Sequence, residues 1–315
     1  GLLFLYLPMV VLVIYSFNAS RLVTVWAGFS TRWYLELFRD QQILSAVWTS
    51  LRIAFFSAST AVCLGTLAAF VMVRFTRFRG KTALSSMVTA PLVMPEVITG
   101  LSLLLLFVSM ELTLGWPAGR GMTTVIIAHT TFCMAFVTVI VASRLRDMDE
   151  SLEEAARDLG AGPVRVFFDV TLPVIAPALV AGWLLAFTLS LDDLVIASFV
   201  SGPGASTLPI VVFSKVRLGV SPDINALATI IIAVVAVAVA LSLPRASWRY
   251  FGLLATVTHE LGHAFAALMT GQRLGGIRLS LDHSGTTTSY SRRPMAAVWS
   301  TFWGYPVPAV VGAAM

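Results

Sequence analysis

Long apolar runs separated by short polar segments set the pattern of this chain. Several of these runs reach the roughly 20 residues that a helix needs to cross a bilayer. Strand-like alternation is absent from them, and only helices or closed barrels satisfy their backbone groups in lipid. The pattern therefore predicts an all-α polytopic membrane protein. The six predicted spans cover residues 2–17, 46–73, 83–108, 122–142, 177–200 and 224–243.

Basic residues predict how these spans are oriented. They cluster after the second, fourth and sixth spans, and basic residues are enriched in the cytoplasmic connections of membrane proteins. We therefore expect the N-terminus and these three connections to be cytoplasmic. The clusters contain Arg74, Arg77, Arg79 and Lys81, then Arg144 and Arg146, then Arg245 and Arg249.

Prolines and glycines predict where the helices bend or stop. Pro91 and Pro95 fall inside the third span, where their missing amide hydrogens predict a kink. Residues 201–222 lie between the fifth and sixth spans and contain Gly202-Pro203-Gly204. We expect this segment to form an outer loop.

Composition agrees with a membrane protein. The chain is 57% hydrophobic and 12% charged, and we attribute its net charge of +5 to the positive-inside bias rather than to nucleic-acid binding. Cys63 and Cys133 both lie in apolar runs, so no disulfide framework is predicted. Because Gly1 already belongs to an apolar run, we expect a truncated N-terminus without a cleavable signal peptide.

Residues 151–173 form one of the few long polar segments. A short amphipathic helix is predicted to end at Gly160 and at Gly162-Pro163, since glycine suits a left-handed cap and proline cannot continue the helix. A second amphipathic piece, residues 164–170, is predicted to end at Leu172-Pro173. This pattern favours a helix-turn-helix that docks onto another protein, and an ordinary solvated loop is the alternative. The first helix carries Glu153, Glu154, Arg157 and Asp158.

Three carboxylates, Glu96, Asp192 and Asp193, lie within or beside the apolar spans. A charge at the centre of a membrane helix costs about 3 kcal/mol on insertion scales, so such residues usually face a wet cavity and mark a substrate or ion path. The alternative is that they pair with arginine or cap helix ends. Adjacent helical residues point about 100° apart, so Asp192 and Asp193 cannot both face one point.

Several motifs carry a family resemblance. Glu154-Ala155-Ala156, Gly160 and Leu172-Pro173 resemble the EAA loop of ABC-importer permease subunits. Residues 12–18, 90–100 and 190–199 resemble the polyamine (putrescine/spermidine-type) branch of that family. The resemblance covers residues 1 to about 243 and implies the six-helix, type I MetI-like permease fold.

The resemblance also implies a function and partners. It implies an ATP-driven importer of polyamines in the bacterial inner membrane, in which the EAA loop inserts into a cytoplasmic ATPase dimer. The further partners that the resemblance implies are a second permease subunit, a periplasmic polyamine-binding protein and membrane lipid. It implies no cofactor for the permease part and no nucleic acid. Glu96, Asp192 and Asp193 would line the path of the polycation. Gly80-Lys81-Thr82 resembles the end of a phosphate loop, but the required first glycine falls on Phe75.

A further apolar helix, residues 251–269, contains His259-Glu260-Leu261-Gly262-His263. This H-E-x-x-H pattern places two imidazoles on one helix face, where they can bind zinc, with Glu260 as general base for a metal-bound water. The alternative is a pair of hydrogen-bonded histidines at a helix interface. The following polar segment has a hairpin-like pattern, and Asp282 and His283 are the nearby spare candidates for a third ligand.

Residues 244–315 resemble the membrane zinc metallopeptidases of the site-2-protease, M50 type. The matching motifs include residues 258–264 and Gly304-Tyr-Pro306. Members of that class complete the zinc site with a ligand from a later helix, so we expect this segment to be a C-terminally truncated, non-catalytic fragment. A membrane zinc metallopeptidase is therefore the alternative function. The junction near residues 243–250 fits either a gene fusion or a sequence joined from two neighbouring genes.

Overall fold

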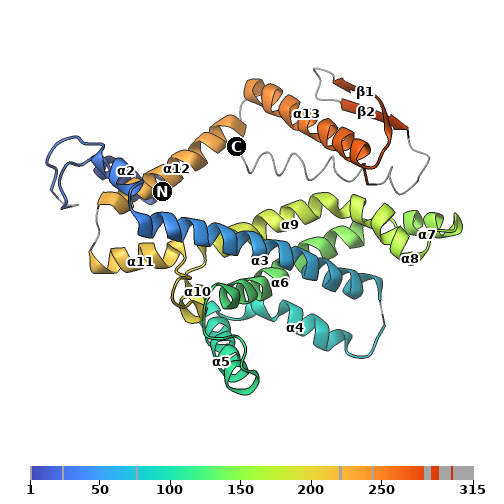
Figure 1. Ribbon diagram of the computed structural model, residues 1–315, viewed down its shortest axis with the longest axis horizontal. Helices are drawn as coiled ribbons and strands as arrows, with labels where there is room; N and C mark the ends of the chain where they lie inside the picture. The colour runs from blue at the N-terminus through green and yellow to red at the C-terminus, as the bar shows by residue number, and fades with distance from the viewer. Residues whose placement is uncertain are drawn as a thin grey trace. The chain divides into compact units, whose positions relative to one another are not determined.

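Helices make up most of the regular structure (Figure 1). The computed structural model describes residues 2–22, 25–75, 77–219, 222–242, 245–279, 285–290 and 299–300. The chain divides into two compact units, Gly1–Leu145 with Ala181–Val234 and Arg146–Val180 with Val235–Met315. The predicted all-α membrane class is confirmed, with one small sheet near the C-terminus.

Four described helices are long and apolar enough to cross a membrane. The predicted first and sixth spans are also helical, but their apolar parts, Tyr6–Tyr15 and Pro222–Val237, are shorter. The four are Gln41–Arg74, Glu96–Leu114, Met122–Asp147 and Pro163–Asp192. The helices that lie wholly or for most of their length in the first unit are α1 (Leu2–Tyr15), α2 (Arg32–Leu37), α3 (Gln41–Arg74), α4 (Lys81–Val93), α5 (Glu96–Leu114), α6 (Met122–Asp147), α10 (Val195–Val200), α11 (Leu208–Leu218) and α12 (Pro222–Ser242).

Two predicted spans are broken into separate helices. In the third span the predicted kink is a full break, because α4 ends at Val93 and α5 starts at Glu96. Met94 is extended, as expected for the residue before a proline. The fifth span breaks at Asp193 and Leu194, and the predicted outer loop that follows contains α11. The turn residues of the sequence did not indicate the break in the fifth span or the helix in the outer loop.

The second unit contains the remaining helices and the sheet, except that the helical residues 181–192 belong to the first unit. Pro173 does not end the second amphipathic piece as predicted, because α8, η1 and α9 run as one helix from Pro163 to Asp192. In η1 the Leu172 N–H bonds back to the Phe167 carbonyl, and this wider π-turn accommodates the proline ring. The elements are α7 (Ser151–Asp158), α8 (Pro163–Val166), η1 (Phe167–Thr171), α9 (Leu172–Asp192), α13 (Arg245–Met269), β1 (Arg273–Leu279) and β2 (Gly285–Tyr290).

The hairpin-like pattern after α13 forms a two-stranded antiparallel sheet. Its register runs from Arg273 opposite Tyr290 to Leu279 opposite Gly285, with an irregularity between Leu274 and Gly276. Both strands pack against α13.

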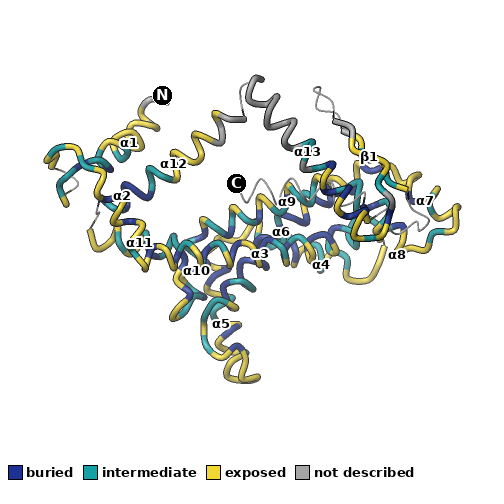
Figure 2. The backbone as a smooth tube through the Cα atoms, turned by 45° about the horizontal axis from the view of Figure 1, so that its top comes forward, coloured by how far each residue is buried: buried dark blue, intermediate teal, exposed yellow. Residues whose placement is uncertain are grey.

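Small residues let the spans of the first unit approach closely. Helix α6 is the most buried of the four long helices, whereas α5 is largely exposed (Figure 2). Gly65 of α3 faces Val137 of α6, where a Cβ atom would lie 2.9 Å from Val137 Cγ1. Close backbone approach of this kind is how helices associate in lipid, where apolar burial gives no driving force.

A salt-bridge network joins the ends of three helices in the first unit. Lys215 Nζ on α11 lies 2.6 Å from Asp40 Oδ2, before α3, and 3.0 Å from Asp223 Oδ2, in the first turn of α12. Burial acts to raise the pKa of Asp40, but Lys215 and the N–H groups of Gln42 and Ile43 lower it overall. Burial acts to lower the pKa of Lys215, but its two carboxylate partners raise it.

Substitution of Gly65 tests the close contact between α3 and α6. Gly65→Ala is expected to lower stability by about 1–3 kcal/mol, because Val137 is β-branched and cannot move aside easily. Gly182→Ala is the matched control, since its Cβ would lie at an ordinary 3.5 Å from the same valine. Thermal unfolding in detergent measures the difference. Equal melting temperatures for the two variants would contradict this packing.

Candidate functional site

Helix α7 is short, amphipathic and capped at both ends. Asp149 accepts the Ser151 N–H at 3.0 Å before the helix, and this bond lowers the pKa of Asp149. Gly160 follows the helix with φ +86°, in the left-handed region that favours glycine. The Ala161 N–H then reaches back to the Ala156 carbonyl at 3.0 Å. The predicted capped helix is thus present and is followed by the predicted glycine-containing turn.

The predicted coupling residues occupy different environments on this unit. Glu154 and Ala155 are exposed, and Ala156 is half-buried. Leu159, just after α7, is a large apolar side chain that is 90% exposed. Leu172 and Pro173 are half-buried at the start of α9. The tip around α7 therefore presents an acidic and apolar surface that suits docking.

Glu153 departs from its neighbours because it is only 3% exposed. The Thr171 hydroxyl donates to Glu153 Oε1 at 2.7 Å, and Arg157 Nη2 lies 3.4 Å from Glu153 Oε2. Sequence reasoning missed this distinction between Glu153 and Glu154. The available signal was the i, i+4 spacing of Glu153 and Arg157, which does not indicate burial.

The predicted path carboxylates lie at the two helix breaks. Glu96 is exposed in the first turn of α5, directly after the α4–α5 break. Asp192 is exposed at the end of α9, and Asp193 is buried in the α9–α10 break. Helices α5 and α10 pack together, with Gly100 against Ile196 and Phe199 of α10. The structure therefore brings the two interrupted spans into contact.

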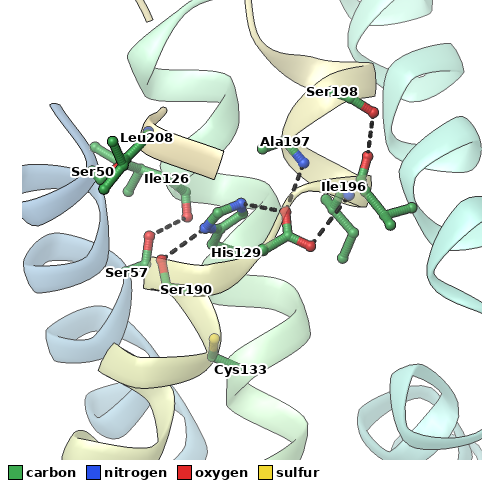
Figure 3. A network of polar contacts seen from close by, with 12 residues as sticks. Ser50, Ser57, Ile126, His129, Cys133, Ser190, Ile196, Ala197, Ser198 and Leu208 are labelled. Atoms are coloured by element: carbon green, nitrogen blue, oxygen red, sulfur yellow. Dashed lines mark hydrogen bonds and ion pairs between the residues drawn. The ribbon is translucent and has the colours of Figure 1, made fainter. Parts of the chain in front are cut away.

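Asp193 stabilises the break after α9 through hydrogen bonds with the start of α10. Its partners Ile196 and Ala197 are labelled in Figure 3. Its carboxylate accepts the N–H groups of Ile196 at 3.3 Å and Ala197 at 2.7 Å, which satisfies the start of α10. His129 Nε2 on α6 lies 3.1 Å from Asp193 Oδ2, and His129 Nδ1 lies 2.7 Å from Ser190 Oγ. His129 is 1% exposed. Sequence reasoning missed this histidine, although an ionisable residue in an apolar span is itself a signal.

The far end of α10 is satisfied in the same way. The Thr124 hydroxyl donates to the Val200 carbonyl at 2.8 Å, and Arg120 Nη1 donates to the Phe199 carbonyl at 3.4 Å. The order Ser190, His129 and Asp193 resembles that of a hydrolase triad. Here the three groups are buried and the aspartate caps a helix, so we assign them to positioning α10.

The histidines of α13 converge as the H-E-x-x-H pattern predicts. His259 Nε2 and His263 Nε2 are 3.0 Å apart, and two nitrogens on one tetrahedral zinc lie roughly 3.3 Å apart. His263 Nδ1 lies 2.6 Å from the Ser300 carbonyl, which favours the tautomer that leaves Nε2 for a metal. Buried Glu260 accepts a hydrogen bond from Thr287 of β2. This pair fits two ligands of a zinc ion, and the 3.0 Å separation also fits the alternative of a hydrogen bond between the two histidines.

A third ligand is not found among the residues that the structure describes, where no group of three metal-binding side chains occurs. The two candidates from the sequence, Asp282 and His283, lie outside the described residues.

Comparison with known proteins covers both parts of the chain. Residues 61–251 match the family model of binding-protein-dependent transport system inner membrane components, and residues 231–315 match that of Peptidase M50B-like proteins. The two matches overlap within α12 and the start of α13.

Curated relatives and solved structures agree with the first match. The putrescine transport system permease protein PotI of Escherichia coli (strain K12) is 65% identical over 237 residues, which are 75% of this chain and 84% of that protein. The spermidine/putrescine transport system permease protein PotC of Haemophilus influenzae is 44% identical over 229 residues, covering 73% of this chain and 86% of that protein.

A bacterial ABC transporter that imports the polysaccharide alginate shares the fold. The TM-score is 0.58 at 18% identity, with 75% of this chain and 88% of that chain covered. The predicted permease fold is thereby confirmed. The chain belongs to the family of binding-protein-dependent transport system inner membrane components, and its spans are those of an inner-membrane permease.

Proposed function

We propose that this chain is the membrane-spanning permease subunit of an ATP-driven importer of putrescine-like polyamines. The 65% identity to a putrescine permease, extending over three quarters of the chain, carries this proposal. The permease part comprises residues 1–243 in this proposal, and residues 244–315 form a separate metallopeptidase-like segment.

Helix α7 supplies the contact with a separate ATPase. Exposed Glu154 and Leu159 form a surface that a cleft in a partner can enclose, and the caps at both ends keep the helix formed. Exposed Arg144 and Arg146 precede α7, which supports a cytoplasmic location for it and hence for the N-terminus.

The two helix breaks supply the substrate path. The C-terminal end of a helix carries partial negative charge, and α4 and α9 each end beside an exposed carboxylate, Glu96 and Asp192. Interrupted helices recur at transporter substrate sites. Ammonium groups of a polyamine would be attracted to the C-terminal ends of α4 and α9. Asp193 is already engaged by His129 and α10, so its contribution is to hold the break in place.

Two further partners complete the transporter. The largely exposed span α5 suits lipid or a second permease subunit. The alginate transporter has also been solved in complex with a substrate-bound periplasmic protein, which supports a periplasmic polyamine-binding protein as the donor of substrate here.

A membrane zinc metallopeptidase is the second candidate function. The approach of the two Nε2 atoms to 3.0 Å and the match of residues 231–315 favour it. His259 and His263 would hold zinc, which when bound supplies an acidified water, and Glu260 would accept a proton. His259 and His263 are the ligands identified among the described residues, so this second proposal is limited to zinc binding.

Reversal of charge on α7 tests the coupling role. Glu154→Lys is expected to reduce ATPase association and putrescine uptake by about tenfold or more. The lysine would either face a basic group of the ATPase or leave a positive charge in the interface without an acidic partner. Pull-down of the ATPase and uptake into proteoliposomes measure the two effects. Glu36→Lys, at an exposed position of α2, is the control. Normal association and uptake with Glu154→Lys would exclude this role.

Asp192 and Asp193 should respond differently to amide substitution. Asp192→Asn is expected to raise the KM of putrescine uptake about fivefold without loss of stability, because one exposed ion pair with substrate is removed. Asp193→Asn is expected to lower stability by about 2 kcal/mol, because its amide nitrogen replaces one of the two buried oxygens that accept the N–H groups of Ile196 and Ala197. Uptake kinetics and thermal unfolding separate the two. Identical behaviour of both variants would contradict the assignment.

Metal analysis tests the second candidate. The purified chain is expected to bind about one zinc per molecule, as measured by elemental analysis after dialysis. His259→Ala combined with His263→Ala should abolish binding and leave putrescine uptake unchanged. Binding that survives the double substitution, or a wild-type chain without stoichiometric zinc, would overturn the proposal.

A further inference from the structure

Glu153 is a buried carboxylate on a helix that otherwise faces outward. Its neighbours Leu152 and Glu154 are exposed, whereas its own side chain is almost fully enclosed. A buried carboxylate requires hydrogen-bond donors, and Thr171 is one of them. Glu153 is therefore oriented toward the body of its own unit, away from the docking surface.

The donor belongs to a different element from α7. Thr171 is fully buried and is the last residue of η1, eighteen positions beyond Glu153. Since η1 continues directly into α9, the hydrogen bond connects α7 to a membrane-spanning helix. The π-turn adds a residue to this turn of helix and so changes the direction in which Thr171 points.

The covalent connection between α7 and α8 is a weak mechanical link. It consists of residues 159–162 and contains two glycines, of which Gly160 is in the left-handed region. Glycine-containing turns bend easily because their backbone has many allowed conformations. A push on α7 would be absorbed there unless a second contact closes the hairpin.

We propose that the Thr171–Glu153 hydrogen bond is a brace that makes α7 and α9 move as one body. This inference rests on the proposed function, in which an ATPase moves α7. Glu153 and Thr171 are positioning residues: they do not meet substrate or ATPase. Glu154, the next residue, faces the ATPase. The two adjacent glutamates therefore have different roles: Glu154 contacts the ATPase, and Glu153 transmits the motion of α7 to α9.

Thr171→Val tests the brace, because valine has nearly the shape of threonine and lacks the hydroxyl. In proteoliposomes with the ATPase, the second permease subunit and the binding protein, putrescine taken up per ATP hydrolysed should fall about fivefold or more while ATP hydrolysis continues. Thr171→Ser should restore the ratio. Thr188→Val on α9 is the matched control, since its hydroxyl bonds its own helix at the Leu184 carbonyl.

Hydrogen exchange of residues 151–158 gives a readout that does not depend on transport. In the full chain in nanodiscs, the amides of α7 should exchange about tenfold faster in Thr171→Val than in Thr171→Ser or Thr188→Val. Unchanged exchange would overturn the brace. Faster exchange in Thr171→Val, combined with a wild-type transporter that takes up no putrescine, would support the brace and reject the proposed function.

Discussion

A bilayer offers no water to the backbone, so each break in a spanning helix must be satisfied by the protein itself. The α9–α10 break shows how this is done. Asp193 takes the N–H groups at the start of α10, and Thr124 and Arg120 donate to carbonyls at its end. His129 then ties Asp193 to α6, the most buried span. A short helix can thus persist inside an apolar environment.

The same constraint separates residues that hold the structure from residues that can act. At the break, Asp193 is committed to the backbone and Asp192 remains exposed. On α7, Glu153 is committed to Thr171 and Glu154 remains exposed. In both places two adjacent carboxylates have different surroundings, because neighbouring residues on a helix or at its end point in different directions.

Sequence periodicity predicted the membrane class, the capped α7 helix and the hairpin after α13, because apolar length, glycine caps and polar turns are local signals. It did not predict the break after Asp192, where the contact with His129 is distant in the sequence, or the passage of the helix through Pro173, which depends on the π-turn of η1. Similarly, Glu153 and Glu154 are the same residue type, and the contacts of Glu153 with Thr171 and Arg157 distinguish them. The convergence of His259 and His263 was predictable from their spacing of four.

Helix α3 has a length that bears on how the protein sits in the bilayer. Its 34 residues extend about 51 Å at 1.5 Å per residue, against a hydrocarbon core of about 30 Å. About a third of the way along it, Arg52 lies 4.8 Å from the ring of Trp48, a pairing suited to the headgroup region. A helix this long must tilt in the bilayer or protrude from it. Because α3 is continuous, the distance between its two ends does not change with the thickness of the surrounding membrane.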